Sequence, residues 1–248
     1  MADIKNIPIL MYHHVMAGDG KNLPEDSSFV GLADFEAQSL ALSTAGYKTL
    51  DFTELGSILD DKMKAPEKPV IICIDDGYAE TLKSVLPVLS GNRQKAVVGL
   101  VTACIGEFDD WQKARKEYYK IIDETLVVEY SRLCFSFVSH SQTHPFLSRL
   151  SDNELEKELR DSKHTIEKLT GKPVNTLIYP YGDRHERVKT GLAAAGYRFG
   201  VSISAKTRYV LEDLLDLRRV YVKKDENTGT FMRKLSPWYL WYRGLRRR

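Results

Sequence analysis

The chain has 248 residues, of which 43% are hydrophobic and 28% are charged. These values predict one globular domain with a sizeable core and exclude a fibrous or wholly disordered chain. The formal net charge is only +2, and the last sixteen residues hold six basic and no acidic side chains, so a mildly acidic body and a basic tail are expected.

The sequence shows neither a signal peptide nor a membrane span. Its first residues lack a basic segment followed by a long apolar run, and no stretch approaches the roughly 20 apolar residues that cross a bilayer. Three well-separated cysteines, without a C-x-x-C motif, predict buried free thiols at Cys73, Cys104 and Cys134. These features are typical of a reducing compartment, so we expect a cytoplasmic protein.

Apolar runs alternate with amphipathic stretches along the chain. The predicted elements, in chain order, are strand 7–15, helix 33–46, helix 53–61, linker 62–69, strand 70–75, helix 79–91, strand 96–102, mixed helix across 106–131, strand 133–140, helix 151–171, strand 174–180, helix 185–196, strand 198–204 and strand 217–222.

This alternation predicts an α/β fold with parallel strands beneath a helical layer. Polar residues come directly after several strands, as they do at the rim of barrel enzymes, so a barrel is favoured over an open sheet. We expect one barrel domain over residues 1–232 and a basic aromatic tail over 233–248. His164 and His185 lie on predicted helices and are expected at the surface.

The first motif is "VIICIDDGYAE", in which Asp75 and Asp76 follow a buried strand. Adjacent carboxylates at the end of such a strand cost free energy unless positive charge neutralises them. An isolated Asp-Asp-Gly is also ordinary turn chemistry.

The second motif is "SHSQTHPFL", in which His140 and His144 lie four residues apart after another strand. This spacing lets two imidazoles converge, and with one carboxylate they form a common three-ligand set for a catalytic metal. Alone, the pair is more typical of a solvated loop. Together with the paired acids it predicts a divalent cation, most simply zinc, although nickel, cobalt or iron suit the same ligands. The second carboxylate can then accept a proton from water.

The third motif is "YPYGDR", residues 179–184. Its proline fixes one backbone angle and its glycine relaxes another, so the turn can aim a backbone N–H into the rim. An N–H in such a position can stabilise an oxyanion. On its own, the segment could equally be an aromatic turn.

The three motifs, in this order, resemble those of the polysaccharide deacetylases, also called the carbohydrate esterase 4 or NodB-homology family. The segments "MYHHV" and "DFEAQSLALSTAGYKTL" resemble its poly-N-acetylglucosamine deacetylase branch, and the resemblance covers about residues 7–222. It implies a distorted (β/α)7 TIM-like barrel that hydrolyses N-acetyl groups of amino-sugar glycans.

The resemblance also implies roles for individual residues. Asp75 would be the general base, and the backbone N–H of Tyr181 would contact the oxyanion. His13 would be the general acid. The metal ligands would be Asp76, His140 and His144. Lower-ranking candidates for substrate binding are His14, Tyr179, Pro180 and Asp183.

The sequence departs from the family pattern at several positions. Ile178 replaces the usual arginine before the Tyr-Pro-Tyr turn, so an arginine that orients the base must come from elsewhere, with Arg219 and Arg218 as candidates. Cys73-Ile74 replaces the usual Thr-Phe pair. No histidine follows His185, so the common C-terminal acid is absent, which favours His13 in that role.

The tail "SPWYLWYRGLRRR", residues 236–248, combines Trp and Tyr with arginine. This composition suits a membrane surface, and it suits equally a terminal helix that covers the barrel. We expect peripheral membrane contact and no nucleic acid, with a lipid-linked or lipopolysaccharide-type glycan as substrate. The alternatives are a deformylase or O-acetyl esterase on a related glycan and a catalytically silent glycan-binding barrel.

Overall fold

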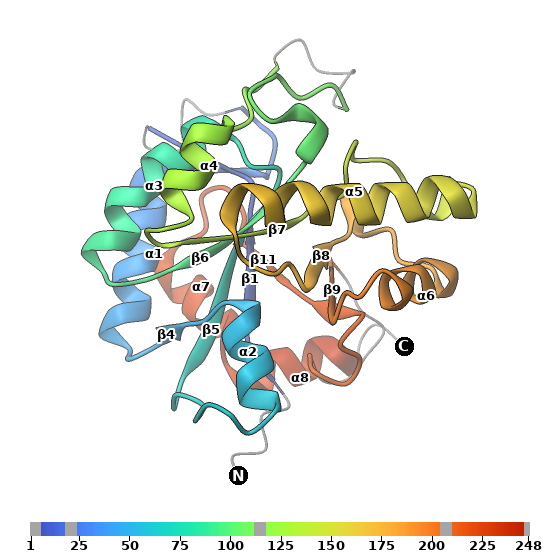
Figure 1. The fold of residues 1–248 in the computed structure, drawn as a ribbon. Helices are drawn as coiled ribbons and strands as arrows, with labels where there is room; N and C mark the ends of the chain where they lie inside the picture. Colours follow the sequence, from blue (N-terminus) through green and yellow to red (C-terminus); the bar gives the residue numbers. More distant parts are fainter. Residues whose placement is uncertain (1–5, 18–23, 112–117, 204–209, 246–248) are drawn as a thin grey trace.

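A computed structural model describes residues 6–17, 24–111, 118–203 and 210–245 (Figure 1). Its parallel strands form one continuous sheet that curves into a nearly closed barrel. Their order is β10 (Leu217–Arg218), β9 (Phe199–Ser202), β8 (Thr176–Ile178), β7 (Phe135–Ser139), β6 (Ala96–Leu100), β5 (Pro69–Ile74), β1 (Ile9–Tyr12) and β11 (Val220–Tyr221).

The last strand closes the barrel by changing its partner. β10 pairs with β9, whereas β11 pairs with β1, and only Arg219 separates the two short strands. The strand predicted at 217–222 is therefore split in two, with each half on a different edge of the sheet. Counted as one strand, the two halves give seven positions, which confirms the predicted distorted (β/α)7 barrel.

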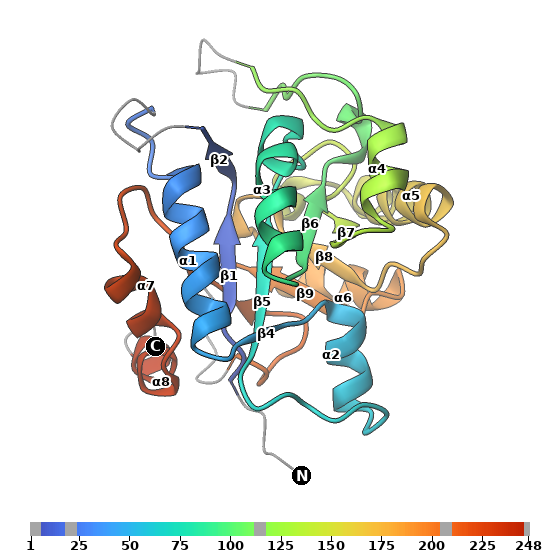
Figure 2. The same ribbon diagram turned by 90° about the vertical axis from the view of Figure 1, so that its left-hand side faces the viewer.

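The strands are buried on both faces, which explains their continuous apolar sequences. In β5, Ile71 and Cys73 face the barrel interior, where they join a cluster that includes Phe52 and Leu55 of α2 (Phe52–Leu59). Ile72 and Ile74 face outward and belong to the larger cluster beneath the helices. The short helix α2 therefore closes one end of the barrel (Figure 2).

Helices surround the barrel on its outer side (Figures 1 and 2). α5 (Asp152–Thr170) begins with a capping box between Ser151 and Glu154 and ends at Gly171, which has φ +67°, in agreement with the predicted helix. The other helices are α1 (Leu32–Thr44), α3 (Ala79–Gly91), α4 (Glu124–Tyr130), α6 (Glu186–Ala194), α7 (Thr228–Lys234) and α8 (Pro237–Leu245).

The predicted strand 7–15 breaks at His13, and its second part, β2 (His14–Met16), pairs with β3 (Phe29–Gly31). Within 106–131 only α4 is regular α-helix, and residues 112–117 lie outside the described ranges. The remaining short elements are β4 (Lys48–Thr49), η1 (Thr102–Cys104), η2 (Leu147–Arg149) and η3 (Pro180–Gly182).

The predicted burial of the cysteines is confirmed only in part, whereas the predicted exposure of two histidines is confirmed. All three cysteines are free, but only Cys73 is fully buried, because Cys104 and Cys134 lie at the half-buried outer ends of their apolar runs. His164 and His185 are exposed, as predicted, and His185 is the N-cap of α6 rather than an interior residue.

The expected tail begins inside α7, whose last residues are Arg233 and Lys234. Leu235, which follows α7, is buried in the outer core cluster. Among the helices of the described ranges, none has the length and apolar character needed to cross a bilayer.

Candidate active site

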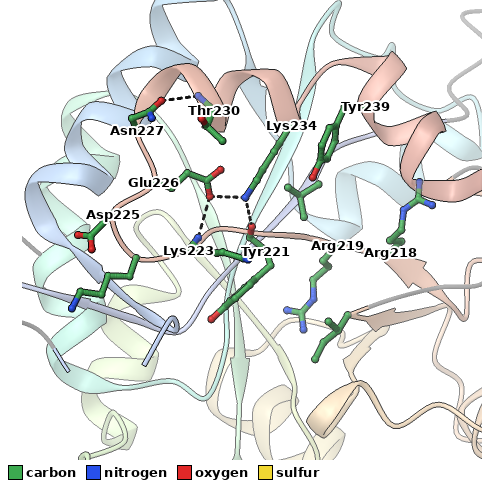
Figure 3. Close-up of a pocket in the computed structure, with 13 residues that line it drawn as sticks. Arg218, Arg219, Tyr221, Lys223, Asp225, Glu226, Asn227, Thr230, Lys234 and Tyr239 are labelled. Carbon is green, nitrogen blue, oxygen red and sulfur yellow. Dashed lines mark hydrogen bonds and ion pairs between the residues drawn. The ribbon is translucent and has the colours of Figure 1, made fainter. Parts of the chain in front are cut away.

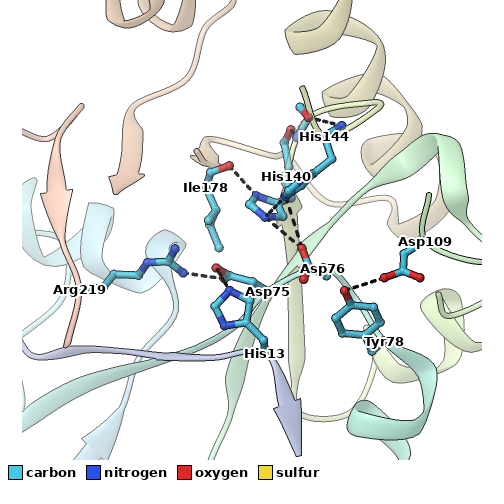
Figure 4. Close-up of polar contacts among 11 residues, drawn as sticks. His13, Asp75, Asp76, Tyr78, Asp109, His140, His144, Ile178 and Arg219 are labelled. Atoms are coloured by element: carbon cyan, nitrogen blue, oxygen red, sulfur yellow. Dashed lines mark hydrogen bonds and ion pairs between the residues drawn. The ribbon is translucent and has the colours of Figure 1, made fainter. Parts of the chain in front are cut away.

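The chemically reactive side chains gather where the barrel strands end (Figure 4). Asp75 and Asp76 follow β5, and His140 follows β7. Arg219 lies between β10 and β11, and His13 lies between β1 and β2. Because parallel strands end at one rim of the barrel, residues far apart in the sequence meet there.

Asp76, His140 and His144 converge on one point. Asp76 Oδ1 lies 3.3 Å from His140 Nε2 and 3.6 Å from His144 Nε2, and the two nitrogens are 3.2 Å apart. All three side chains are buried, and their three ligand atoms lie within 4.8 Å of one another. One carboxylate and two imidazoles match a three-ligand catalytic metal set.

The hydrogen bonds of His140 also fit this role. Its Nδ1 lies 2.8 Å from the carbonyl oxygen of Ile178, which can only accept, so Nδ1 carries the proton. When the ring is neutral, its Nε2 lone pair is therefore directed at Asp76 and His144. A carbonyl partner of this kind is the usual way to fix the tautomer of a metal-ligating histidine.

The backbone at these ligands is constrained. The N–H of Gly77 donates to the carbonyl oxygen of Asp75 over 2.9 Å, which makes Asp76, with φ +70°, the centre of a γ-turn. His144 also has positive φ, +58°. Such conformations cost about 1–3 kcal/mol each and are concentrated at functional sites. Gly77, next in the chain, has φ +82°, which favours glycine, and a Cβ there would also approach the Leu100 side chain closer than 3.0 Å.

A carboxylate from α5 holds the loop that carries His144. Glu158 accepts hydrogen bonds from the backbone N–H groups of Gln142 and Thr143, at 2.8 and 2.9 Å, and from the Thr143 hydroxyl at 2.6 Å. The Ser141 hydroxyl oxygen accepts from the N–H of His144 over 3.0 Å. The polar residues between the two histidines therefore fix the position of the second ligand.

Asp75 has different neighbours from Asp76. Arg219 Nη1 donates to Asp75 Oδ1 over 2.6 Å, and both side chains are almost fully buried. On the other side, His13 Nε2 lies 3.7 Å from Asp75 Oδ2. Burial acts to raise the pKa of Asp75, but the charges of Arg219 and His13 outweigh it and hold that pKa below its usual value. Asp75 is therefore ionised at neutral pH.

The two metal-site imidazoles differ in their electrostatics. Burial, reinforced by neighbouring His140, lowers the pKa of His144 to about 3. His144 is therefore neutral and able to ligate at physiological pH. Burial also acts to lower the pKa of His140, but the hydrogen bond to Asp76 and the charge of Asp75 raise it overall. A bound cation would have to compete with that proton.

A cavity of about 520 Å³ lies here, and its lining includes Tyr179, Tyr181 and the six side chains that carry the chemistry: His13, Asp75, Asp76, His140, His144 and Arg219. Tyr181 has φ +57°, is 43% exposed, and places its ring 4.6 Å from the His144 ring. The left-handed conformation at Tyr181 therefore lies beside a candidate metal ligand, His144.

Four other predicted residues lie elsewhere. His14 is buried between the rings of Phe29 and Tyr78, at 4.1 and 4.0 Å, and does not line the cavity. The alternation of strand residues explains this, because His13 and His14 point to opposite sides. The other three, which likewise do not line this cavity, are Pro180, Asp183 and Arg218.

Each of these three has a different environment. Pro180 is buried at the start of η3. The Asp183 carboxylate accepts a hydrogen bond from the N–H of Ser148 over 2.8 Å, which is a structural role. Arg218 lines a neighbouring pocket, and of the two candidate arginines it is Arg219 that contacts Asp75.

Sequence reasoning missed Trp111 and Asp109. The Trp111 ring stacks on the His144 ring at 4.6 Å and lines the cavity, and Asp109 accepts a hydrogen bond from the Tyr78 hydroxyl over 3.2 Å. Both lie in the charged, aromatic segment that lacks a regular periodicity. The sequence did offer one signal for these residues: the segment directly follows the predicted strand 96–102. A segment in that position begins at the rim of the barrel, where the other candidate residues lie.

Comparisons with known proteins agree with this geometry. The family model described as polysaccharide deacetylase matches residues 62–200. The chain is 27% identical over 225 residues to YxkH of Bacillus subtilis, a protein named after the same family, with 91% of this chain and 74% of that protein covered.

Solved structures show the same fold. The deacetylase PplD of Streptococcus pyogenes, determined with acetate, has a TM-score of 0.80 at 21% identity, with coverage of 93% of this chain and 98% of PplD. The polysaccharide deacetylase BC0361 of Bacillus cereus has a TM-score of 0.76 at 26% identity, with coverage of 93% and 69%. The chain belongs to the polysaccharide deacetylase family.

The ligand geometry predicts that zinc stabilises the folded protein. A cation that binds only the native state at 100 times its dissociation constant adds about 2.7 kcal/mol to the free energy of unfolding. We expect the melting temperature to rise when zinc is added to chelator-treated protein, and His144→Asn to abolish the rise. Asp75→Asn is the matched control and should retain it. An equal rise in the His144 variant would contradict the site.

Proposed function

We propose that this protein is a metal-dependent N-deacetylase that acts on an amino-sugar glycan. The observation that carries the proposal is the cluster of Asp76, His140 and His144 next to a second carboxylate, Asp75, that is held by Arg219. Membership of the polysaccharide deacetylase family supports hydrolytic removal of an acyl group. One of the similar solved structures is described as a de-N-acetylase, from Aggregatibacter actinomycetemcomitans.

Asp75 is suited to act as the general base. It is ionised, and it lies next to Asp76 in the chain but makes different contacts, so it can accept a proton while Asp76 ligates. A divalent cation in the Asp76 site would polarise the acetyl carbonyl and lower the pKa of water. Arg219 keeps the Asp75 carboxylate charged and fixes its orientation from the side opposite His13.

His13 is suited to act as the general acid. Its Nε2 faces Asp75 at 3.7 Å, and its side chain remains 24% exposed to the cavity. Water adds to the acetyl carbon as Asp75 takes one of its protons. The C–N bond then breaks, His13 delivers a proton to the sugar nitrogen, and acetate leaves. The Tyr181 N–H is the proposed donor to the oxyanion.

The lipid carrier and the membrane contact stay predictions. Trp238 in α8 is 66% exposed and stacks on Tyr242 at 5.2 Å, so one aromatic pair of the tail is available to a surface. We propose that this helix contacts the cytoplasmic face of a membrane. Sedimentation with anionic liposomes should lose most of the protein from the pellet when residues 236–248 are deleted, and undiminished binding would rule the contact out.

Replacing the proposed base tests the reaction directly. Asp75→Asn preserves shape and removes the proton acceptor, so acetate release from an N-acetylated chito-oligosaccharide should fall by about 10²- to 10⁴-fold. Parallel assays for acetate and formate separate a deacetylase from a deformylase, and an O-acetylated sugar tests esterase activity. Retention of near-normal acetate release by the variant would refute the assignment of Asp75.

The ion pair between Arg219 and Asp75 leads to a prediction about the pH dependence of kcat/KM. With Arg219 present, the pKa of Asp75 is below its usual value, so the base loses activity only when the pH falls through that low pKa. In Arg219→Gln, burial is no longer offset and the pKa of Asp75 rises. The acidic limb of the kcat/KM profile should therefore move to higher pH, and Arg219→Lys should move it less. An acidic limb at the same pH in all three proteins would contradict this role.

A further inference from the structure

A second cavity, of about 600 Å³, adjoins the catalytic cavity (Figure 3). It lies between the last strand, the segment 223–227 that follows β11, and the C-terminal helices α7 and α8. Ile203, Arg219 and Tyr221 line both cavities. The two cavities are therefore neighbours, and the volume of the second is within the usual range for a small-molecule site.

This second cavity is rich in positive charge. Its lining contains two acidic residues, Asp225 and Glu226. It contains five basic residues: Arg218, Arg219, Lys223, Lys224 and Lys234. The whole chain has a formal net charge of only +2, so this concentration of basic side chains is a local feature.

Some of these charges are already paired. Arg219 is bound to Asp75 in the catalytic cavity. Lys234 Nζ lies 2.5 Å from Glu226 Oε2 and 2.8 Å from the carbonyl oxygen of Tyr221, as the dashed lines in Figure 3 show. These contacts build the wall of the cavity, and they neutralise one of its two acids.

Lys223 is different. Its backbone N–H donates to Glu226 Oε2 over 3.1 Å, which fixes the residue at the wall, while the residue as a whole is exposed. Among the described residues, no carboxylate lies within ion-pair distance of its ammonium group. Lys224 Nζ donates to the carbonyl oxygen of Pro24 over 3.2 Å, which orders that side chain.

Apart from Arg219 and Lys234, the lining holds three basic residues, Arg218, Lys223 and Lys224, against one further acid, Asp225. Glu226 is committed to Lys234. The cavity therefore offers positively charged donors to whatever enters from the catalytic side.

We propose that this cavity is a subsite for the sugar next to the acetylated one, and that it selects a sugar bearing an anionic group, either a carboxylate or a phosphate. Lys223 and Lys224 bind that group through charge-assisted hydrogen bonds, which are stronger than neutral ones. The inference rests on the proposed deacetylase function, because that function places the acetylated sugar in the adjoining cavity.

Two oligosaccharides of equal length test the selection. One contains only N-acetylglucosamine, and the other alternates N-acetylglucosamine with glucuronate. We expect kcat/KM of the native enzyme to favour the acidic one, and the double variant Lys223→Gln/Lys224→Gln to lose about tenfold on it, the order expected for one charged contact. Activity on the neutral oligosaccharide should not change. Lys157 is an exposed lysine on α5. Its substitution Lys157→Gln is the matched control and should leave kcat/KM unchanged on both oligosaccharides.

A binding measurement separates this inference from the proposed function. Calorimetry with Asp75→Asn protein and the alternating oligosaccharide should show an affinity that falls in the double lysine variant and with rising salt concentration.

Competition experiments identify the anionic group. Competition by inorganic phosphate would indicate a phosphate as the natural group, and competition by free glucuronate would indicate a carboxylate. Lysine-dependent binding without any acetate release would refute the deacetylase and keep the anion subsite. Deacetylation with equal preference for both oligosaccharides, or binding indifferent to the lysine changes, would overturn the subsite.

Discussion

The closure of the barrel at Arg219 is the constraint on which both the fold and the site depend. The segment 217–221 pairs first with β9 and then with β1, and the change of partner falls at Arg219. Since β1 lies next to β5, this closure brings the Arg219 guanidinium to Asp75 at the end of β5. The same backbone step that joins the first and last strands thus supplies the positive charge that the buried base requires.

That arrangement resolves the problem of two adjacent buried carboxylates. Asp75 is stabilised by an arginine and lies near His13, whereas Asp76 turns through a γ-turn toward two imidazoles. Neighbouring acids with different partners can take different chemical roles. The strained backbone at Asp76 and His144 persists because the surrounding network, including Glu158 and Ser141, over-determines it.

The catalytic cavity and the basic cavity lie next to each other at the closing strand. Arg219 and Tyr221 belong to both, so the element that completes the barrel also connects the proposed reaction centre to the proposed subsite. The proposed action on a glycan would make use of both cavities, because a polymer presents several sugars at once. In that proposal, the recognition of neighbouring sugars depends on residues that follow the last strand rather than on the motifs that carry the chemistry.

The sequence alone determined the barrel class, because apolar strand runs, helix caps and polar residues after strands are short-range signals. It also marked the paired acids, the two histidines four apart and the Tyr-Pro-Tyr turn, since each lies within one short segment. It left open which arginine meets Asp75, and it did not find Trp111, Asp109 or the lysine-rich cavity. Those features join segments about 30 to 140 residues apart. Only the closure of the barrel decides such contacts, because pairing between distant strands sets them and no local periodicity records it.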